Sequence, residues 1–201
     1  MMRYPAFFDQ APVIPMRDPL AALLGAADEG LIDYHYLDAV RLAGHSCPTV
    51  AGAYLMARSA LRALYPDTPA ERGGIAVQMS GAEHDGVNGV IAQVLTLITG
   101  AAADNGFHGI GGHFVRQSLL GFSTEADGGA VRFSRRDTGA SMAVELDLAS
   151  IPAPANLRQL LGAALDPTAS ARQRSDFAHA WQERVRRLLL DHADDPAVVQ
   201  L

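Results

Sequence analysis

The run from Thr49 to Leu64 limits the possible folds more than any other part of this sequence. Its apolar residues recur at intervals of three and four, which is typical of an α-helix with one buried face. These residues are Val50, Ala53, Tyr54, Ala57, Ala60, Leu61 and Leu64. Pro66 and Pro69 follow the run and end it, because proline cannot continue a helix. The sequence therefore predicts a long helix whose mostly small side chains pack closely inside a core.

The rest of the chain alternates between strand-like and helix-like segments. Strands are expected at residues 31–37, 74–79, 115–122, 130–135 and 141–148. Helices are expected at residues 19–30, 38–42, 49–64, 90–99, 156–165 and 170–192. Glycine-containing turns at Asp127-Gly128-Gly129 and Asp137-Thr138-Gly139 are typical of hairpins and would join the last three strands.

These elements predict one α+β domain over residues 1–201, with a mixed or antiparallel sheet and packed helices. Residues 1–17 contain three prolines and are expected to form an extended N-terminal arm. Residues 155–201 are expected to form a helical C-terminal extension. Both flanking segments suit contact with a second copy of the chain or with another protein.

Composition excludes several classes of function. All 16 basic residues are arginine and the formal net charge is −6, which argues against nucleic acid as a partner. Cys47 is the single cysteine, so no internal disulfide can form, and this suits a reducing compartment. The first residues do not resemble a secretory signal, and no run reaches the roughly 18 apolar residues of a membrane span. A cytoplasmic protein without membrane contact is therefore expected.

The segment Gly44-His45-Ser46-Cys47-Pro48 stands directly before the long helix. A histidine and a cysteine two residues apart on a turn can direct nitrogen and sulfur at one cation, a pair preferred by zinc and similar metals. Cys47 also precedes a helix N-terminus, where free amides stabilise a thiolate. The same spacing occurs where a buried cysteine follows a hydrogen-bonded turn histidine. The motif alone thus leaves metal ligation, thiol chemistry and a structural turn open.

Gly-His-Ser-Cys-Pro, followed by a helix of small residues, resembles the Gly-His-x-Cys-Pro-Gly signature of the E-type subunits of formylmethanofuran dehydrogenases, which we call the E-type family. The order of elements is similar too, with a strand, a turn at Asp85-Gly86-Val87-Asn88, a helix and a glycine-rich stretch after the motif. The resemblance covers roughly residues 35–125. It implies a metal site that includes His45 and Cys47, a homodimer, and an association with an oxidoreductase partner subunit.

Three positions depart from the family pattern. Ala43 stands where the family usually has a second histidine, and Thr49 stands where it has a glycine. Asp85 occupies the position of a family cysteine, so a carboxylate would replace a thiolate there. Only His45 and Cys47 carry over residue by residue.

A stable zinc site needs one or two further protein ligands. The side chains able to supply them are His84, Asp85, His108 and His113. His108 and His113 stand five residues apart in a glycine-rich loop, where both could turn toward one ion. Glu83 is a possible general base beside a metal-bound water, or an ordinary turn carboxylate. His35, in a predicted strand, and His179 and His192, in the last helix, are interpreted as structural or exposed.

Three functions follow from these observations. The first is a metal-binding protein, with zinc or a similar divalent ion, which could be a metal-dependent enzyme of unknown substrate. The second is an accessory protein without chemistry of its own, which handles metal or bridges subunits. The third is a metal-free thiol enzyme in which His45 serves as the base for Cys47.

Overall fold

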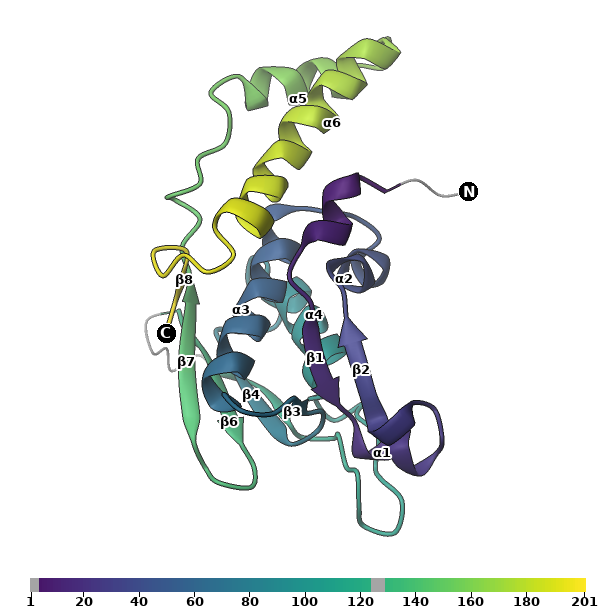
Figure 1. Cartoon of the computed structure of the whole chain (residues 1–201). Helices are drawn as coiled ribbons and strands as arrows, with labels where there is room; N and C mark the ends of the chain where they lie inside the picture. Colours follow the sequence, from purple (N-terminus) through teal and green to yellow (C-terminus); the bar gives the residue numbers. More distant parts are fainter. Residues whose placement is uncertain (1–3, 124–128) are drawn as a thin grey trace.

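The computed structural model describes residues 4–123 and 129–201. Its α-helices are α1 (Pro19–Leu23), α2 (Tyr36–Ala43), α3 (Pro48–Leu64), α4 (Asn88–Thr99), α5 (Leu157–Leu165) and α6 (Ala171–Arg186). Its strands are β1 (Ile14–Arg17), β2 (Leu31–Tyr34), β3 (Ala70–Glu71), β4 (Ile75–Ser80), β5 (Leu120–Ser123), β6 (Val131–Arg135), β7 (Ser141–Leu146) and β8 (Val199–Gln200). Figure 1 shows their arrangement. The expected α+β class is confirmed.

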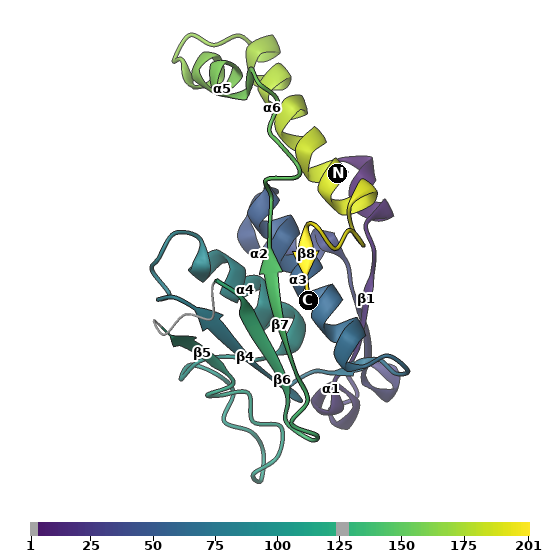
Figure 2. The same ribbon diagram turned by 90° about the vertical axis from the view of Figure 1, so that its left-hand side faces the viewer.

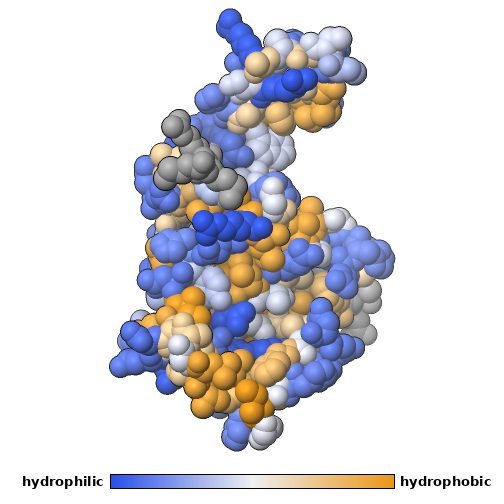
Figure 3. All heavy atoms as spheres, turned by 90° about the vertical axis from the view of Figure 1, so that its right-hand side faces the viewer, coloured by the Kyte–Doolittle hydropathy of each residue, from blue (hydrophilic) through white to orange (hydrophobic). Residues whose placement is uncertain are grey.

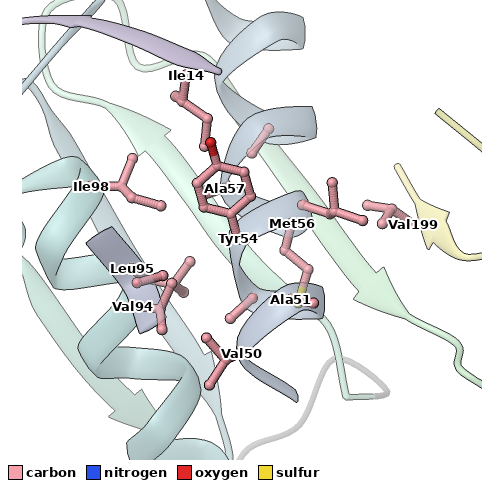
Figure 4. Packing of buried hydrophobic residues seen from close by; sticks show 14 of the residues in the cluster. Ile14, Val50, Ala51, Tyr54, Met56, Ala57, Val94, Leu95, Ile98 and Val199 are labelled. Carbon is pink, nitrogen blue, oxygen red and sulfur yellow. The ribbon is translucent and has the colours of Figure 1, made fainter. Parts of the chain in front are cut away.

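Helix α3 lies at the centre of the molecule, as its apolar pattern predicts. Cys47 caps its first turn, and every residue from Val50 to Ala57 is buried. Side chains of α4 pack on one side of α3, while Ile14 of β1 and Val199 of β8 approach it from other elements (Figure 4). The small side chains let these neighbours come close.

Tyr54 shows how α3 fixes the N-terminal part of the chain. Its hydroxyl lies 2.6 Å from the carbonyl oxygen of Pro12 and 2.8 Å from that of Tyr34. Burial raises the pKa of Tyr54, so the hydroxyl keeps its proton and remains a donor. One buried side chain therefore connects the central helix to β2 and to the segment just before β1.

The described strands form two sheets, one in the order β2-β1-β3 and one in the order β5-β4-β6-β7-β8. Strands β4 and β5 pair in parallel, because α4 and the segment after it carry the chain back along the sheet. Strands β4, β6 and β7 pair antiparallel. Figure 2 shows this larger sheet beside α3 and α4.

Several boundaries differ from the sequence-based expectation. The segment expected to be an extended arm contributes β1, the middle strand of the smaller sheet, and Met16 is fully buried there. Helix α1 begins at Pro19 as predicted, but it ends at Leu23 because Gly25 turns the chain at a φ of 67°. Helix α2 is longer than the single turn expected.

The hairpin predicted between the strands at 115–122 and 130–135 is wrong. Strand β4 lies between β5 and β6, so these two strands do not pair with each other. Most of the predicted turn, Asp127-Gly128-Gly129, lies outside the described residues. The second hairpin is confirmed: β6 pairs with β7, and Gly139 turns the chain at a φ of 75°.

The two C-terminal helices are confirmed. Helix α5 and the first half of α6 pack on each other and project from the body of the molecule (Figures 1 and 2). The end of α6 and the helical turn after it, Arg187–Asp191, return to the body, where Val185, Leu188 and Leu189 are buried. No helix in the described residues combines the length and the apolar character needed to cross a membrane.

Exposed hydrophobic side chains gather at the end of the molecule opposite the C-terminal helices. On the face seen in Figure 3, they lie over the region of α1. Leu23 and Leu24 are 60 % and 64 % exposed there. This part of the surface is therefore apolar, although the chain as a whole is acidic.

Candidate functional site

The segment of residues 44–48, which we call the motif loop, joins α2 to α3. Gly44 ends α2 in the left-handed region with a φ of 74°, a conformation that costs glycine little. The side chain of His45 is exposed, and its Nδ1 lies 2.9 Å from the carbonyl oxygen of Ala43. Because a carbonyl can only accept, Nδ1 is the donor, and in the neutral ring Nε2 then has the free lone pair. This is the tautomer in which histidine binds a metal through Nε2.

Cys47 occupies the N-cap position of α3. Its Sγ accepts a hydrogen bond of 3.4 Å from the backbone amide of Val50, and the residue is 8 % exposed. A sulfur in this position faces the free amides of the first helical turn, which stabilise negative charge. The thiol therefore lies at the N-terminus of α3, where it is buried with the hydrophobic core.

The motif loop is held in place by the C-terminal helix. The indole Nε1 of Trp181 donates to the carbonyl oxygen of Ser46 at 3.0 Å, and Nε2 of Gln182 donates to the same oxygen at 3.2 Å. The Ser46 hydroxyl donates to Oε1 of Gln182 at 3.0 Å and lies 2.9 Å from the Tyr36 hydroxyl. Burial raises the pKa of Tyr36, so its phenol remains a donor to Ser46. Ser46, between His45 and Cys47, thus makes four hydrogen bonds with other side chains. Two are at its carbonyl oxygen and two at its hydroxyl.

The other predicted ligands lie elsewhere on the surface. His84 and Asp85 are exposed in the turn after β4, with His84 Nε2 3.7 Å from Asp85 Oδ1. His108 and His113 are exposed on the glycine-rich loop. Ile110 and His113 exchange backbone hydrogen bonds around Gly111 and Gly112, both at positive φ, so this loop is a tight turn.

The structure does not bring the six predicted ligands together. Within residues 4–123 and 129–201, no three His, Cys, Asp or Glu side chains are placed to hold one metal ion. The donors of His45 and Cys47 fit a borderline-soft metal by their chemistry. They supply two ligands, and any further ones would have to be water or come from another molecule.

The pairing needed by the thiol-enzyme hypothesis is not formed in the described part of the chain. Cys47 Sγ receives its hydrogen bond from the amide of Val50, and His45 Nδ1 is engaged with Ala43, so no hydrogen bond joins nucleophile and base. Glu83 is exposed in the turn before α4.

The remaining histidines have structural or surface roles, as interpreted from the sequence. His35 lies after β2 rather than within it, and caps α2 together with Asp38. His179 is exposed on α6, with its Nδ1 2.9 Å from the carbonyl of Ser175. His192 follows α6, and its Nδ1 lies 2.8 Å from Asp195 Oδ2.

A buried cluster of charges could not be predicted from the sequence. Asp18 accepts from Arg116 Nη2 at 2.7 Å and from Arg72 Nη1 at 3.0 Å while capping α1. We call these three residues the Asp18 cluster. Their long separation in sequence leaves no local pattern that would reveal it.

The ionisation of the Asp18 cluster follows from its surroundings. Burial raises the pKa of Asp18, but the hydrogen bond from Arg72 and the charge of Arg116 outweigh this and leave the pKa below its usual value. Burial lowers the pKa of Arg116, although the Asp18 carboxylate opposes the effect. Asp18 and Arg116 therefore remain charged near neutral pH.

Comparison with known proteins identified no relative of this chain. No protein-family model matches the chain, and no curated protein and no solved structure matches it significantly. The resemblance to the E-type family consequently rests on the motif and the element order alone.

Proposed function

We propose that this chain binds a divalent transition-metal ion, zinc or one of similar preference, through His45 and Cys47, and that it handles this metal as an accessory protein. The observation that carries the proposal is the geometry of the motif loop. It presents a free Nε2 and a capped thiol from a segment whose central residue, Ser46, is fixed by Trp181, Gln182 and Tyr36.

Hydrogen bonds that fix the motif loop favour binding, since less conformational freedom of the loop is lost when the metal arrives. Two protein ligands leave other coordination positions open. Open positions suit exchange of the ion with another donor more than permanent structural binding. A second copy of the chain, or an oxidoreductase partner of the kind that the family resemblance implies, would supply the remaining ligands.

The test is titration of the full chain with Co²⁺, followed by the absorption of thiolate-to-cobalt charge transfer. We expect the wild type to develop this absorption and to saturate. Cys47→Ser should abolish the absorption, and His45→Ala should weaken binding by about tenfold or more. His108→Ala is the matched control, because it removes another exposed histidine and should change nothing. Equal cobalt binding by wild type and Cys47→Ser would refute the proposal.

A second measurement addresses the missing ligands. Sedimentation velocity with and without Zn²⁺ should show that the ion promotes self-association of the wild type, and that Cys47→Ser does not respond. Tight binding of zinc by a chain that stays monomeric would argue against ligands shared between copies.

A further inference from the structure

A groove runs along the outer side of α4. Its volume is about 780 Å³, within the range of small-molecule sites. Gly89, Gln93, Thr96 and Gly100 of α4 and its C-cap form one wall. Leu20, Leu42 and the segment of residues 102–107 also line the groove. At roughly 1.5 Å per residue, α4 gives the groove a length of about 18 Å.

One end of the groove is positively charged. Arg72 and Arg116 both line it, and both approach Gly100 closely. A Cβ atom on Gly100 would lie 3.0 Å from Arg116 Nη1 and 3.1 Å from Arg72 Cγ. The two guanidinium groups therefore sit beside each other at the floor of the groove, next to the C-terminus of α4.

Arg116 is incompletely paired. The residue is 6 % exposed, and among the described residues its Nε and Nη1 have no hydrogen-bond partner. Buried donors without a partner are unfavourable and uncommon, and arginine donors prefer anionic oxygens. Nη1 is the unpaired atom nearest Gly100 at this end of the groove.

The charge of this end selects the kind of anion. Two guanidinium groups share the single carboxylate of Asp18, so the Asp18 cluster itself has an excess of one positive charge. The other charged residues of the groove, Glu83 and Asp104, are exposed and acidic. They disfavour a phosphate dianion, whereas a monoanion matches the excess charge.

The rest of the groove is suited to an apolar body. Ala92, Leu97, Phe107, Leu120 and Phe122 line it. Phe107 is 44 % exposed at its edge, and Leu42 is 45 % exposed. A ligand whose apolar part covers these side chains is stabilised by the hydrophobic effect.

We propose that the α4 groove binds a small amphiphilic monocarboxylate, with its carboxylate at Arg72 and Arg116 and its apolar chain along α4. This site is separate from the motif loop, so the proposal does not depend on metal binding.

The test is calorimetric titration of the full chain with octanoate, octanamide and inorganic phosphate. We expect octanoate to bind about tenfold or more tightly than octanamide, because only octanoate makes charge-assisted hydrogen bonds. Arg72→Gln should reduce this preference, while leaving Arg116 and Asp18 paired. Gln93→Trp should block octanoate by filling the groove, and Gln159→Trp on exposed α5 is the matched control.

Four results would overturn the proposal: no octanoate binding at millimolar concentration, equal binding of octanoate and octanamide, unchanged binding by Gln93→Trp, or phosphate competing with octanoate at similar concentration. Circular dichroism shows whether each variant is folded. Since Gln93 is exposed on its helix, the Gln93→Trp result does not depend on variants of the buried cluster. Octanoate binding should also persist in Cys47→Ser, which separates this site from the metal site.

Discussion

The indole nitrogen of Trp181 donates a 3.0 Å hydrogen bond to the carbonyl oxygen of Ser46, which precedes it by 135 residues. The C-terminal helix, which lies outside the part of the chain that resembles the E-type family, thereby reaches the motif loop. Gln182 adds two more hydrogen bonds to the same serine. The extension is thus structurally part of the metal-binding region that we propose.

Removing the Trp181 hydrogen bond should weaken metal binding. Trp181→Phe keeps an aromatic ring beside Phe177 and removes the N–H donor. Groups that orient metal ligands typically contribute 10- to 100-fold to affinity, so we expect a loss of about tenfold in Co²⁺ affinity. The charge-transfer titration measures it, and thermal denaturation controls for folding. Unchanged affinity would mean that the motif loop is fixed without this contact.

The Asp18 cluster should contribute strongly to stability. Asp18→Asn leaves Arg116 buried without its carboxylate partner, and breaking a buried pair in this way costs about 3–5 kcal/mol of unfolding free energy. Urea denaturation at pH 7 measures the loss. Arg172→Gln is a useful control, because its ion pair with Asp176 is exposed and should contribute little.

The same carboxylate predicts a dependence of stability on pH. The pKa of Asp18 is lower in the folded protein than in the unfolded chain, so its contribution is complete above about pH 4. It is lost as the pH falls through the lower, folded-state pKa. The difference in unfolding free energy between wild type and Asp18→Asn should therefore be constant from pH 7 to 5 and shrink below pH 4. A difference that stays constant down to pH 2 would contradict this assignment.

Two glycine substitutions should have opposite effects. A Cβ on Gly106 would lie 2.6 Å from the backbone N and Cα of Gln117, which cannot easily move, so Gly106→Ala should destabilise by about 3 kcal/mol. Gly162 in α5 has open space around it, and Gly162→Ala should stabilise by about 0.5–1 kcal/mol. Chemical denaturation measures the free energy of unfolding of both variants. A similar change in both would contradict the packing around the two glycines.

The Tyr54 hydroxyl should stabilise the attachment of β1 and β2. Tyr54→Phe leaves the carbonyls of Pro12 and Tyr34 without this donor, and we expect a loss of about 1–3 kcal/mol. Tyr65 is half-buried beneath the guanidinium of Arg135, 4.0 Å from its ring centroid. Tyr65→Phe should change stability by less than about 0.5 kcal/mol, as measured by the same denaturation.

Local sequence patterns were sufficient to locate the elements that depend only on residues close together in the chain. The apolar period of α3, the helix start at Pro19, the helix end at Thr99 and the hairpin at Gly139 all appear where they were predicted. Each of these depends on interactions between residues close in sequence, such as capping and the backbone freedom of glycine. Most of the elements could therefore be located from the sequence.

The partners of these elements depend on contacts between distant residues. The hairpin prediction for β5 and β6 failed because β4, far earlier in the chain, inserts between them. The prolines of residues 1–17 indicated an arm, yet Ile14 and Met16 alternate with exposed residues and are buried in a sheet. The pairing of Asp18 with Arg116 spans 98 residues, and the sequence around either residue has no pattern that predicts it.

In the proposed metal site, too, local sequence patterns identified some residues and missed those that depend on distant contacts. The motif indicated His45 and Cys47, and both lie on one short loop between α2 and α3. His84, His108 and His113 were considered as further ligands, but their distance from the motif loop is decided by tertiary packing. Trp181 and Gln182 were expected only as part of an amphipathic helix, although they fix the motif loop.

The most direct test of the central claim is the metal content of the protein. The full chain is purified without chelator and without a metal-binding tag, and elemental analysis compares wild type, Cys47→Ser and His84→Ala. We predict that wild type and His84→Ala carry the same divalent metal in similar amounts, and that Cys47→Ser loses it. Metal that remains in Cys47→Ser, or a wild type that binds none even after incubation with zinc, would contradict metal binding by His45 and Cys47.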